Sequence, residues 1–185
     1  MKPARILCAL LIVLIVLSGV AVCWRVGAEP PAGKAEKARL RVGTFDSRAV
    51  AIAYVSSEVG KRDLGKLFEE HQKAKAAGDT EKVAKLEEQG KARQVRMHEQ
   101  GFSKGRVDDV LEQIKDKLPA IAREAGVDLI VSKWDVVYQG PAVELVDVTE
   151  LVVKPFNPNE RARGWIKDLG KVAPIPLEDA RKIDD

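Results

Sequence analysis

Few residues in this chain have the types and spacing that catalysis requires. Residues 101–105 match the pattern G-x-S-x-G, in which Ser103 would be the nucleophile on a sharp turn between a strand and a helix. Here the pattern follows a helical segment, and both histidines, His71 and His98, precede the serine. A hydrolase of that class needs its histidine later in the chain. The pattern therefore does not predict a serine hydrolase.

Metal and nucleotide chemistry have no better support. A chain folded back at residue 79 places His71 opposite residue 87 and His98 opposite residue 60, so the two imidazoles do not meet. Both cysteines come before residue 24, which leaves the rest of the chain without the ligands of a closed zinc site. The phosphate-binding pattern G-x-x-x-x-G-K-[ST] is absent. We expect no catalytic residue, no metal and no cofactor, and hence no enzyme.

Charged side chains are the remaining candidates for function. Residues 61–106 contain 12 basic and 8 acidic side chains. This excess favours an acidic partner or an anionic membrane surface. A solvated helix pair, however, also needs many charges along its exposed faces, and the sequence leaves both interpretations open. The predicted contact residues lie near a turn at residues 78–80 or on the helices beside it: Lys73, Lys75, Lys82, Lys85, Lys91, Arg93, Leu64 and Phe68.

The element that must position these residues is a helical hairpin over residues 47–125. Its first segment, residues 49–55, is apolar on all sides, which is typical of a buried helix. The last segment, residues 107–125, has an apolar stripe at helical spacing and a proline, Pro119, that should kink or restart the helix. Gly90 lies on the predicted contact stripe of the return helix, where it would let the two helices approach closely.

Strand-like segments flank the hairpin. Residues 39–45 alternate polar and apolar side chains, and residues 127–131 are mainly apolar. Residues 134–138 and 142–146 are predicted to form further strand. A short helix over residues 150–154 completes the domain. From residue 155 onward we expect a mainly disordered tail, in which residues 165–169 form one amphipathic turn.

The first 28 residues are typical of a targeting segment. A positive start precedes residues 6–24, a run of 19 residues without a charge, and small residues follow it. The small residues favour cleavage of a signal peptide, whereas the length of the run favours a retained membrane anchor. A lipoprotein modified at Cys23 is a third alternative, disfavoured by the bulk of Val22. In each case the rest of the chain leaves the cytoplasm, so nucleic acid is not an expected partner. Residues 29–38 are then a linker.

Several of these segments together resemble the Skp/OmpH family of periplasmic chaperones. The resemblance covers residues 39–154 and is carried by V-G-T-F-D at residues 42–46 and by V-D-L-I-V-x(6)-Y-x(8)-D-V-T at residues 127–149. It implies a trimer whose strands form a small body, with helical arms around a cavity that holds unfolded outer-membrane proteins without ATP. The predicted fold is therefore α+β, with a trimerising strand body, a long hairpin arm and a disordered tail.

The short strands favour an oligomer independently, because about twenty strand residues make too small a core for one chain. The predicted subunit contacts are apolar or aromatic side chains of the strands and of the first helix: Val42, Phe45, Ile52, Tyr54, Leu129, Val131 and Tyr138. A monomer with a small core is the alternative. For function, the alternative is an envelope-anchored scaffolding protein without chaperone activity.

Overall fold

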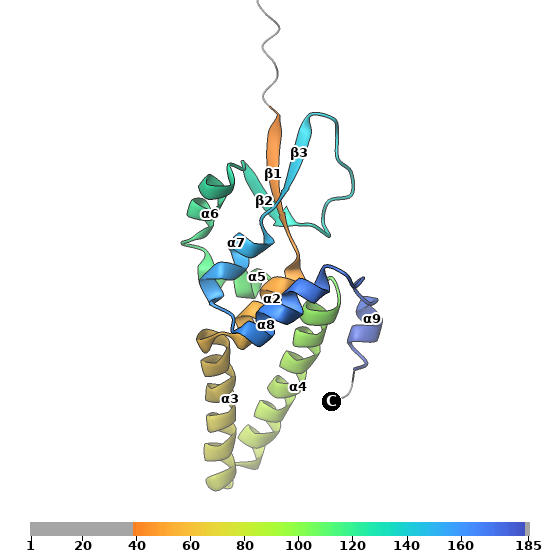
Figure 1. The fold of residues 1–185 in the computed structure, drawn as a ribbon. Coiled ribbons are helices and arrows are strands. Elements are labelled where there is room, and N and C mark those ends of the chain that lie inside the picture. Colours follow the sequence, from red (N-terminus) through yellow and green to blue (C-terminus); the bar gives the residue numbers. More distant parts are fainter. Residues whose placement is uncertain (1–38, 184–185) are drawn as a thin grey trace, which may run out of the picture. The chain divides into compact units, whose positions relative to one another are not determined.

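Three short strands form a parallel sheet in the computed structural model, which describes residues 39–183. The central strand β1 (Leu40–Phe45) pairs with β2 (Leu129–Ser132) on one side and with β3 (Val143–Asp147) on the other. Helices fill most of the remaining sequence, so the predicted mixture of helix and strand is confirmed (Figure 1). The predicted signal or anchor over residues 1–28 and the linker over residues 29–38 lie outside the described residues.

Close backbone packing explains why β1 carries a glycine at its centre. A Cβ atom at Gly43 would lie 3.1 Å from a methyl of Val127 and 3.2 Å from the methyls of Val148. These valines stand before β2 and after β3, and both are buried. Gly43 therefore lets the segments that enter and leave the outer strands close over the centre of the sheet.

The core lies between one face of this sheet and a group of helices. α2 (Ser47–Ser56) follows β1 directly, because Asp46 caps it by accepting a hydrogen bond from the Arg48 amide at 3.0 Å. Val50, Val110 and Val152 are almost completely buried in this core. The short helices of this part of the chain are α5 (Asp108–Leu111), η1 (Glu112–Ile114), α6 (Leu118–Ala125), α7 (Thr149–Val153), η2 (Lys154–Phe156) and α8 (Glu160–Leu169).

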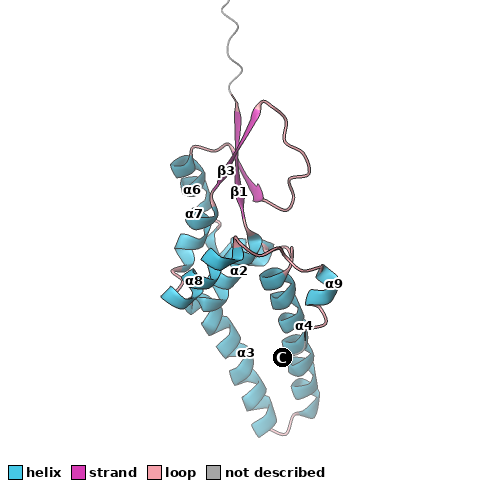
Figure 2. Cartoon of the chain, turned by 45° about the vertical axis from the view of Figure 1, so that its right-hand side comes forward, coloured by secondary structure: helices cyan, strands magenta, loops and turns pink. Residues whose placement is uncertain are grey.

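Two longer helices, α3 (Glu58–Ala76) and α4 (Thr80–Phe102), form an antiparallel hairpin (Figures 1 and 2). Gly78 has a φ of 68°, which favours glycine, and Asp79 caps α4 by accepting from the Lys82 amide at 3.0 Å. The predicted turn is thus confirmed. We call residues 58–102 the hairpin, and residues 39–57 and 103–183 the body.

The predicted hairpin bounds of 47–125 are wrong at both ends. α2 is a separate helix, because its chain breaks at Ser57 and its side chains are buried in the body. After α4 the chain leaves helical geometry at Ser103, and the predicted amphipathic helix is divided into α5, η1 and α6. Pro119 lies in the first turn of α6, so the predicted restart is confirmed.

The strand predicted over residues 134–138 is also wrong. These residues belong to the connection that carries the chain from the end of β2 to the start of β3. Two parallel strands on opposite sides of β1 need such a crossover, and this one contains no helix. Val137 and Tyr138 are 97% and 83% exposed, so the end of this apolar segment does not face the core.

The tail predicted to be disordered is folded over residues 155–183. α8 packs on α2 and buries Ala162 and Ile166, so the amphipathic turn predicted around Trp165 is a full helix of ten residues. The chain then passes the end of α4, where the Ile175 amide donates to the Phe102 carbonyl at 3.0 Å. α9 (Leu177–Ala180) follows and buries Ala180. The prolines and charges of residues 155–183 led to the prediction of disorder, but a few buried apolar side chains hold this segment in place.

Candidate interaction surface of the helical hairpin

The hairpin is anchored at its base and closed at its turn. Ser57 caps α3 by accepting from the Gly60 amide at 3.1 Å, and the Tyr54 hydroxyl donates to Asp63 at 2.8 Å. Near the turn, Ala74 of α3 and Leu86 of α4 are buried. Most of the surface between these two ends is exposed, so it is available for binding.

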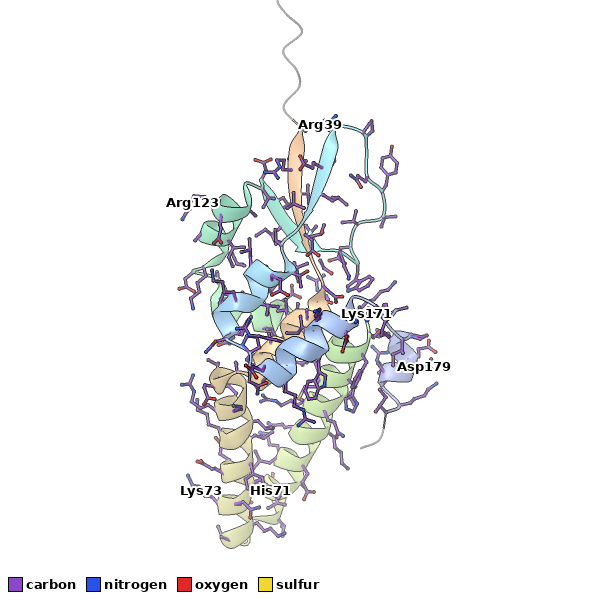
Figure 3. The ribbon with its side chains drawn as sticks, in the orientation of Figure 1. Arg39, His71, Lys73, Arg123, Lys171 and Asp179 are labelled. Atoms are coloured by element: carbon purple, nitrogen blue, oxygen red, sulfur yellow. The ribbon has the colours of Figure 1, made fainter. Side chains whose placement is uncertain are left out.

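The basic residues predicted as contacts are placed along this exposed surface. Four lysines (Lys73, Lys75, Lys82 and Lys85) gather around the turn, and within residues 39–183 none of the four forms an ion pair. Figure 3 shows Lys73 on the outer side of α3. Lys91 is exposed as well, whereas Arg93 is half-buried and donates to the Asp63 carbonyl at 3.4 Å. The structure thus brings the four lysines together and places Arg93 apart, between the helices.

Two predicted apolar contacts, Leu64 and Phe68, lie one helical turn apart on α3. They are 49% and 63% exposed. Leu64 borders a groove of about 390 Å³ between α3 and α4, whereas Phe68 lies outside it. The hairpin therefore presents apolar side chains to solvent next to unpaired cations, which is the composition of a binding surface.

The residues predicted as subunit contacts do not share one surface. Phe45 is buried in the core of its own chain, whereas Val42 is buried between Leu129 and Leu145 on the face of the sheet that points away from that core. Ile52 packs against the core, and Tyr54 packs edge-on against Phe156 with ring centres 6.1 Å apart. Desolvation, followed by the Asp63 hydrogen bond, raises the pKa of Tyr54. The residues that remain exposed or partly exposed are Leu129, Val131 and Tyr138.

Ser103, His71 and His98, the residues considered for catalysis, each contact neighbouring residues of the fold. Ser103 is buried at the end of α4, and its hydroxyl donates to the Ile175 carbonyl at 2.7 Å. His71 lies 3.4 Å from Glu87 across the hairpin, as the folding at residue 79 predicts, while the His98 ring packs near Phe102. In the described part of the chain no group of three or more His, Cys, Asp or Glu side chains could hold a metal.

A buried cluster of charged side chains, formed by Asp46, Arg48 and Lys133, was not predicted from the sequence. The Asp46 carboxylate is buried between Arg48, at 2.8 Å, and Lys133, at 2.7 Å. Burial disfavours its ionisation, but the hydrogen bonds from Arg48 and Lys133 outweigh burial, so the pKa of Asp46 is lowered. Arg48 also donates to the Leu169 and Val172 carbonyls and so ties α2 to the chain after α8.

No periodicity or motif connects these residues, because their positions span most of the chain. Lys133 and Arg48 also lie over the ring of Trp134, at 4.4 and 5.1 Å from its centre. The alternation of charge at Asp46 and Arg48 was the only sequence signal, and it is too common to be specific. The cluster joins the sheet, α2 and the tail, which makes it a structural centre of the body.

Comparisons with protein-family models, with curated proteins and with solved structures found no match. Among the described residues, no helix has both the length and the apolar composition needed to cross a membrane.

Proposed function

We propose that this protein is an ATP-independent holdase chaperone of the periplasm, similar to the Skp/OmpH family, which binds unfolded outer-membrane proteins. The observation that carries this proposal is the surface of the hairpin. Leu64 and Phe68 are exposed on α3, and four lysines that form no ion pair among the described residues lie further along the hairpin at its turn; both helices contribute little to the core. Many weak apolar and ionic contacts can retain an unfolded chain through effective concentration, without a nucleotide-driven cycle.

We propose that the protein forms a trimer. The support for an oligomer is an apolar, partly exposed face of the sheet, which points away from the core. Residues paired in register project to the same side. This places Leu129 and Leu145 beside Val42, and Val143 beside Leu40. Leu40 and Leu129 are about half exposed, and Val131, Val143 and Leu145 are only partly buried. Neighbouring copies would cover this apolar face and would hold the hairpins around a shared volume.

The first experiment measures the exported protein by native mass spectrometry and tests it in a client aggregation assay. We expect three copies of a chain that lacks residues 1–28, and suppression of aggregation of an unfolded outer-membrane protein at about one trimer per client. A monomer that fails to suppress aggregation would overturn the proposal. The same mass measurement decides between a cleaved signal peptide and a retained anchor.

A second experiment tests the lysines at the turn against lysines elsewhere. Replacement of Lys73, Lys75, Lys82 and Lys85 by glutamine should weaken client binding at low salt and flatten its salt dependence. The matched control replaces four exposed lysines of the body, Lys117, Lys154, Lys167 and Lys182, so that both variants have the same net charge. Binding to anionic vesicles, measured in parallel, separates a client surface from a membrane surface. Equal client binding by the two variants would show that the position of the lysines at the turn does not matter.

The second candidate function is an envelope-anchored scaffolding protein that uses the body and hairpin as a spacer. The observation in its favour is the run of 19 uncharged residues at positions 6–24, a length that fits a membrane-spanning helix. Retention of this run in the mature protein, together with no effect on client aggregation, would favour this function.

A further inference from the structure

The two helices of the hairpin pack closely near the turn and border a groove nearer the body, where Arg93 of α4 reaches the Asp63 carbonyl of α3. Ala74 and Leu86 are buried where α3 and α4 meet, and Figure 2 shows the helices separating toward the body. A Cβ atom added at Gly65 or at Gly90 would meet nothing within 4 Å. The prediction that Gly90 brings the helices into close approach is therefore wrong, because open space lies next to it.

The groove has an apolar floor that no described residue covers. Tyr54 and Val55, at the end of α2, close it on the body side. Leu64 contributes from α3, and Ala92 and Met97 contribute from α4. Val55 and Leu64 are 41% and 49% exposed, although both border a concave volume of about 390 Å³. This volume is within the range of sites that take up a small ligand or a few side chains.

The rim of the groove is mainly basic. Its lining residues include the cations Lys61, Arg93 and Arg96 and one carboxylate, Asp109. The contact between Arg96 and Asp109 is 3.7 Å long and largely exposed to solvent, so it neutralises Arg96 weakly. Arg93 donates to a backbone carbonyl, that of Asp63. The lining thus has an excess of positive charge around apolar surface.

Two further acidic side chains near the rim, Glu58 and Asp63, could weaken its positive charge. Glu58 pairs with Lys61 at 2.8 Å, but both side chains are strongly exposed and the pair is easily exchanged for another partner. The Asp63 carboxylate accepts from the Tyr54 hydroxyl and is not among the lining residues. Neither group removes the attraction of Arg93 and Arg96 for an acidic ligand that enters between the helices.

From these observations we propose that the groove binds an extended acidic polypeptide segment that carries an aromatic or aliphatic side chain. The apolar side chain lies between Leu64 and Met97, and flanking carboxylates of the segment pair with Arg93 and Arg96. An open channel between two helices admits an extended chain, whereas a flat membrane surface cannot enter it. This inference rests on the proposed holdase function, and it names the type of client segment that the hairpin would select.

The test titrates the full-length protein into a fluorescent peptide of about ten residues, long enough to cross the groove when extended. The peptide has one phenylalanine and one leucine among aspartates and glutamates. We expect saturable binding that weakens about tenfold in the double variant Arg93→Gln, Arg96→Gln and about as much in Leu64→Ser. Leu64 is half exposed, so its replacement leaves the fold intact, which circular dichroism verifies.

The matched control is the double variant Lys117→Gln, Lys167→Gln, which removes the same charge from exposed positions of the body, outside the hairpin. It should leave the dissociation constant within about twofold of the wild-type value. A photo-crosslinker at the phenylalanine of the peptide should label residues 54–64 and 89–97. Equal weakening in both double variants, or labelling at the turn or the sheet, would overturn the proposal. Loss of binding to anionic vesicles in the groove variants, with unchanged peptide binding, would identify a membrane site instead.

The outcomes also separate this inference from the proposed function. Suppression of client aggregation that persists in the groove variants, without groove-dependent peptide binding, contradicts the groove and leaves the holdase function standing. Groove-dependent peptide binding by a protein that does not suppress aggregation supports the groove and contradicts the holdase function.

Discussion

The body and the hairpin both contain helices, but these helices bury very different shares of their side chains. Six of the ten residues of α2 are buried, including Arg48 and Val50. In α3, which has 19 residues, only Gly60 and Ala74 are buried. α4 buries Leu86 near the turn, and its other buried residues lie near the body. Tertiary packing therefore stabilises the body, whereas caps and local contacts stabilise much of the hairpin.

This difference has a functional consequence. A helix that buries most of its side chains in a core, as α2 does, has little surface left for a partner apart from its end at Tyr54 and Val55. The hairpin, by contrast, can change its surface residues at little cost in stability, and it can open locally without unfolding the body. Substitutions that affect stability should therefore concentrate in the body, and substitutions that affect binding should concentrate in the hairpin.

The largest expected effect comes from the buried ion pair of the body. Asp46→Ala leaves the guanidinium of Arg48 buried without a carboxylate, and we expect a loss of about 3–5 kcal/mol in the free energy of unfolding. Urea denaturation followed by circular dichroism measures it. The control is Glu58→Gln, which breaks the exposed pair with Lys61 on the hairpin and should leave the midpoint nearly unchanged. A similar loss of unfolding free energy in both variants would contradict the idea that ion pairs stabilise the body more than the hairpin.

The next effect tests whether the C-terminal segment belongs to the body. Ile166→Ala removes a buried side chain of α8 that packs against the core, and it should cost about 2–4 kcal/mol. Trp165→Ala, at the adjacent and half-exposed position, should cost much less. A disordered tail would make both variants neutral in the same denaturation experiment.

The junction between body and hairpin should be sensitive to a single methyl group. A Cβ atom at Gly60 would lie 2.2 Å from the backbone carbonyl oxygen of Tyr54, so Gly60→Ala should destabilise the protein by about 1–3 kcal/mol. One turn further along α3, Gly65→Ala should have the opposite sign, because its Cβ meets open space. Thermal unfolding of the two variants compares them directly, and destabilisation by both would contradict the open geometry of the hairpin.

A smaller effect is expected from protonation of Asp46. Its pKa in the folded state is lowered relative to about 3.9 in the unfolded chain. The ionised carboxylate therefore adds stability above pH 4, and this contribution is lost as the pH falls through the folded pKa. The difference in unfolding free energy between the wild type and Asp46→Asn should thus shrink on acidification below about pH 4. A difference that stays constant would refute the shift.

The smallest effect is a gain in stability within the hairpin. Gly90→Ala replaces a helical glycine next to open space, and it should stabilise the protein by up to about 1 kcal/mol. Hydrogen exchange should slow in α4 near residue 90 and stay unchanged in the core helices. Faster exchange would indicate that the helices approach one another more closely than the structure shows.

Local sequence signals predicted the elements whose causes are local. The turn at Gly78 and the helix restart at Pro119 were both readable, since each depends on the conformational preference of one residue. The placement of Leu64 and Phe68 on one helix was also readable, because helical spacing and apolar character are properties of a single segment.

Contacts between distant segments were not readable. The prediction of close helix contact at Gly90 was wrong, because α3 and α4 diverge there. The prediction of disorder after residue 155 was wrong, because α8 packs against an apolar surface of α2. The prediction of a strand at residues 134–138 was wrong because apolar and aromatic residues also occur in a connection that pairs with no strand.

The sequence by itself determined a mixed α and β chain with a charged helical hairpin, because caps, turns and hydrophobic periodicity act over a few residues. Only the tertiary structure decided where the hairpin begins, that the tail belongs to the body, and that Asp46, Arg48 and Lys133 meet. Those outcomes depend on which surfaces bury one another, and burial is a property of the whole folded chain.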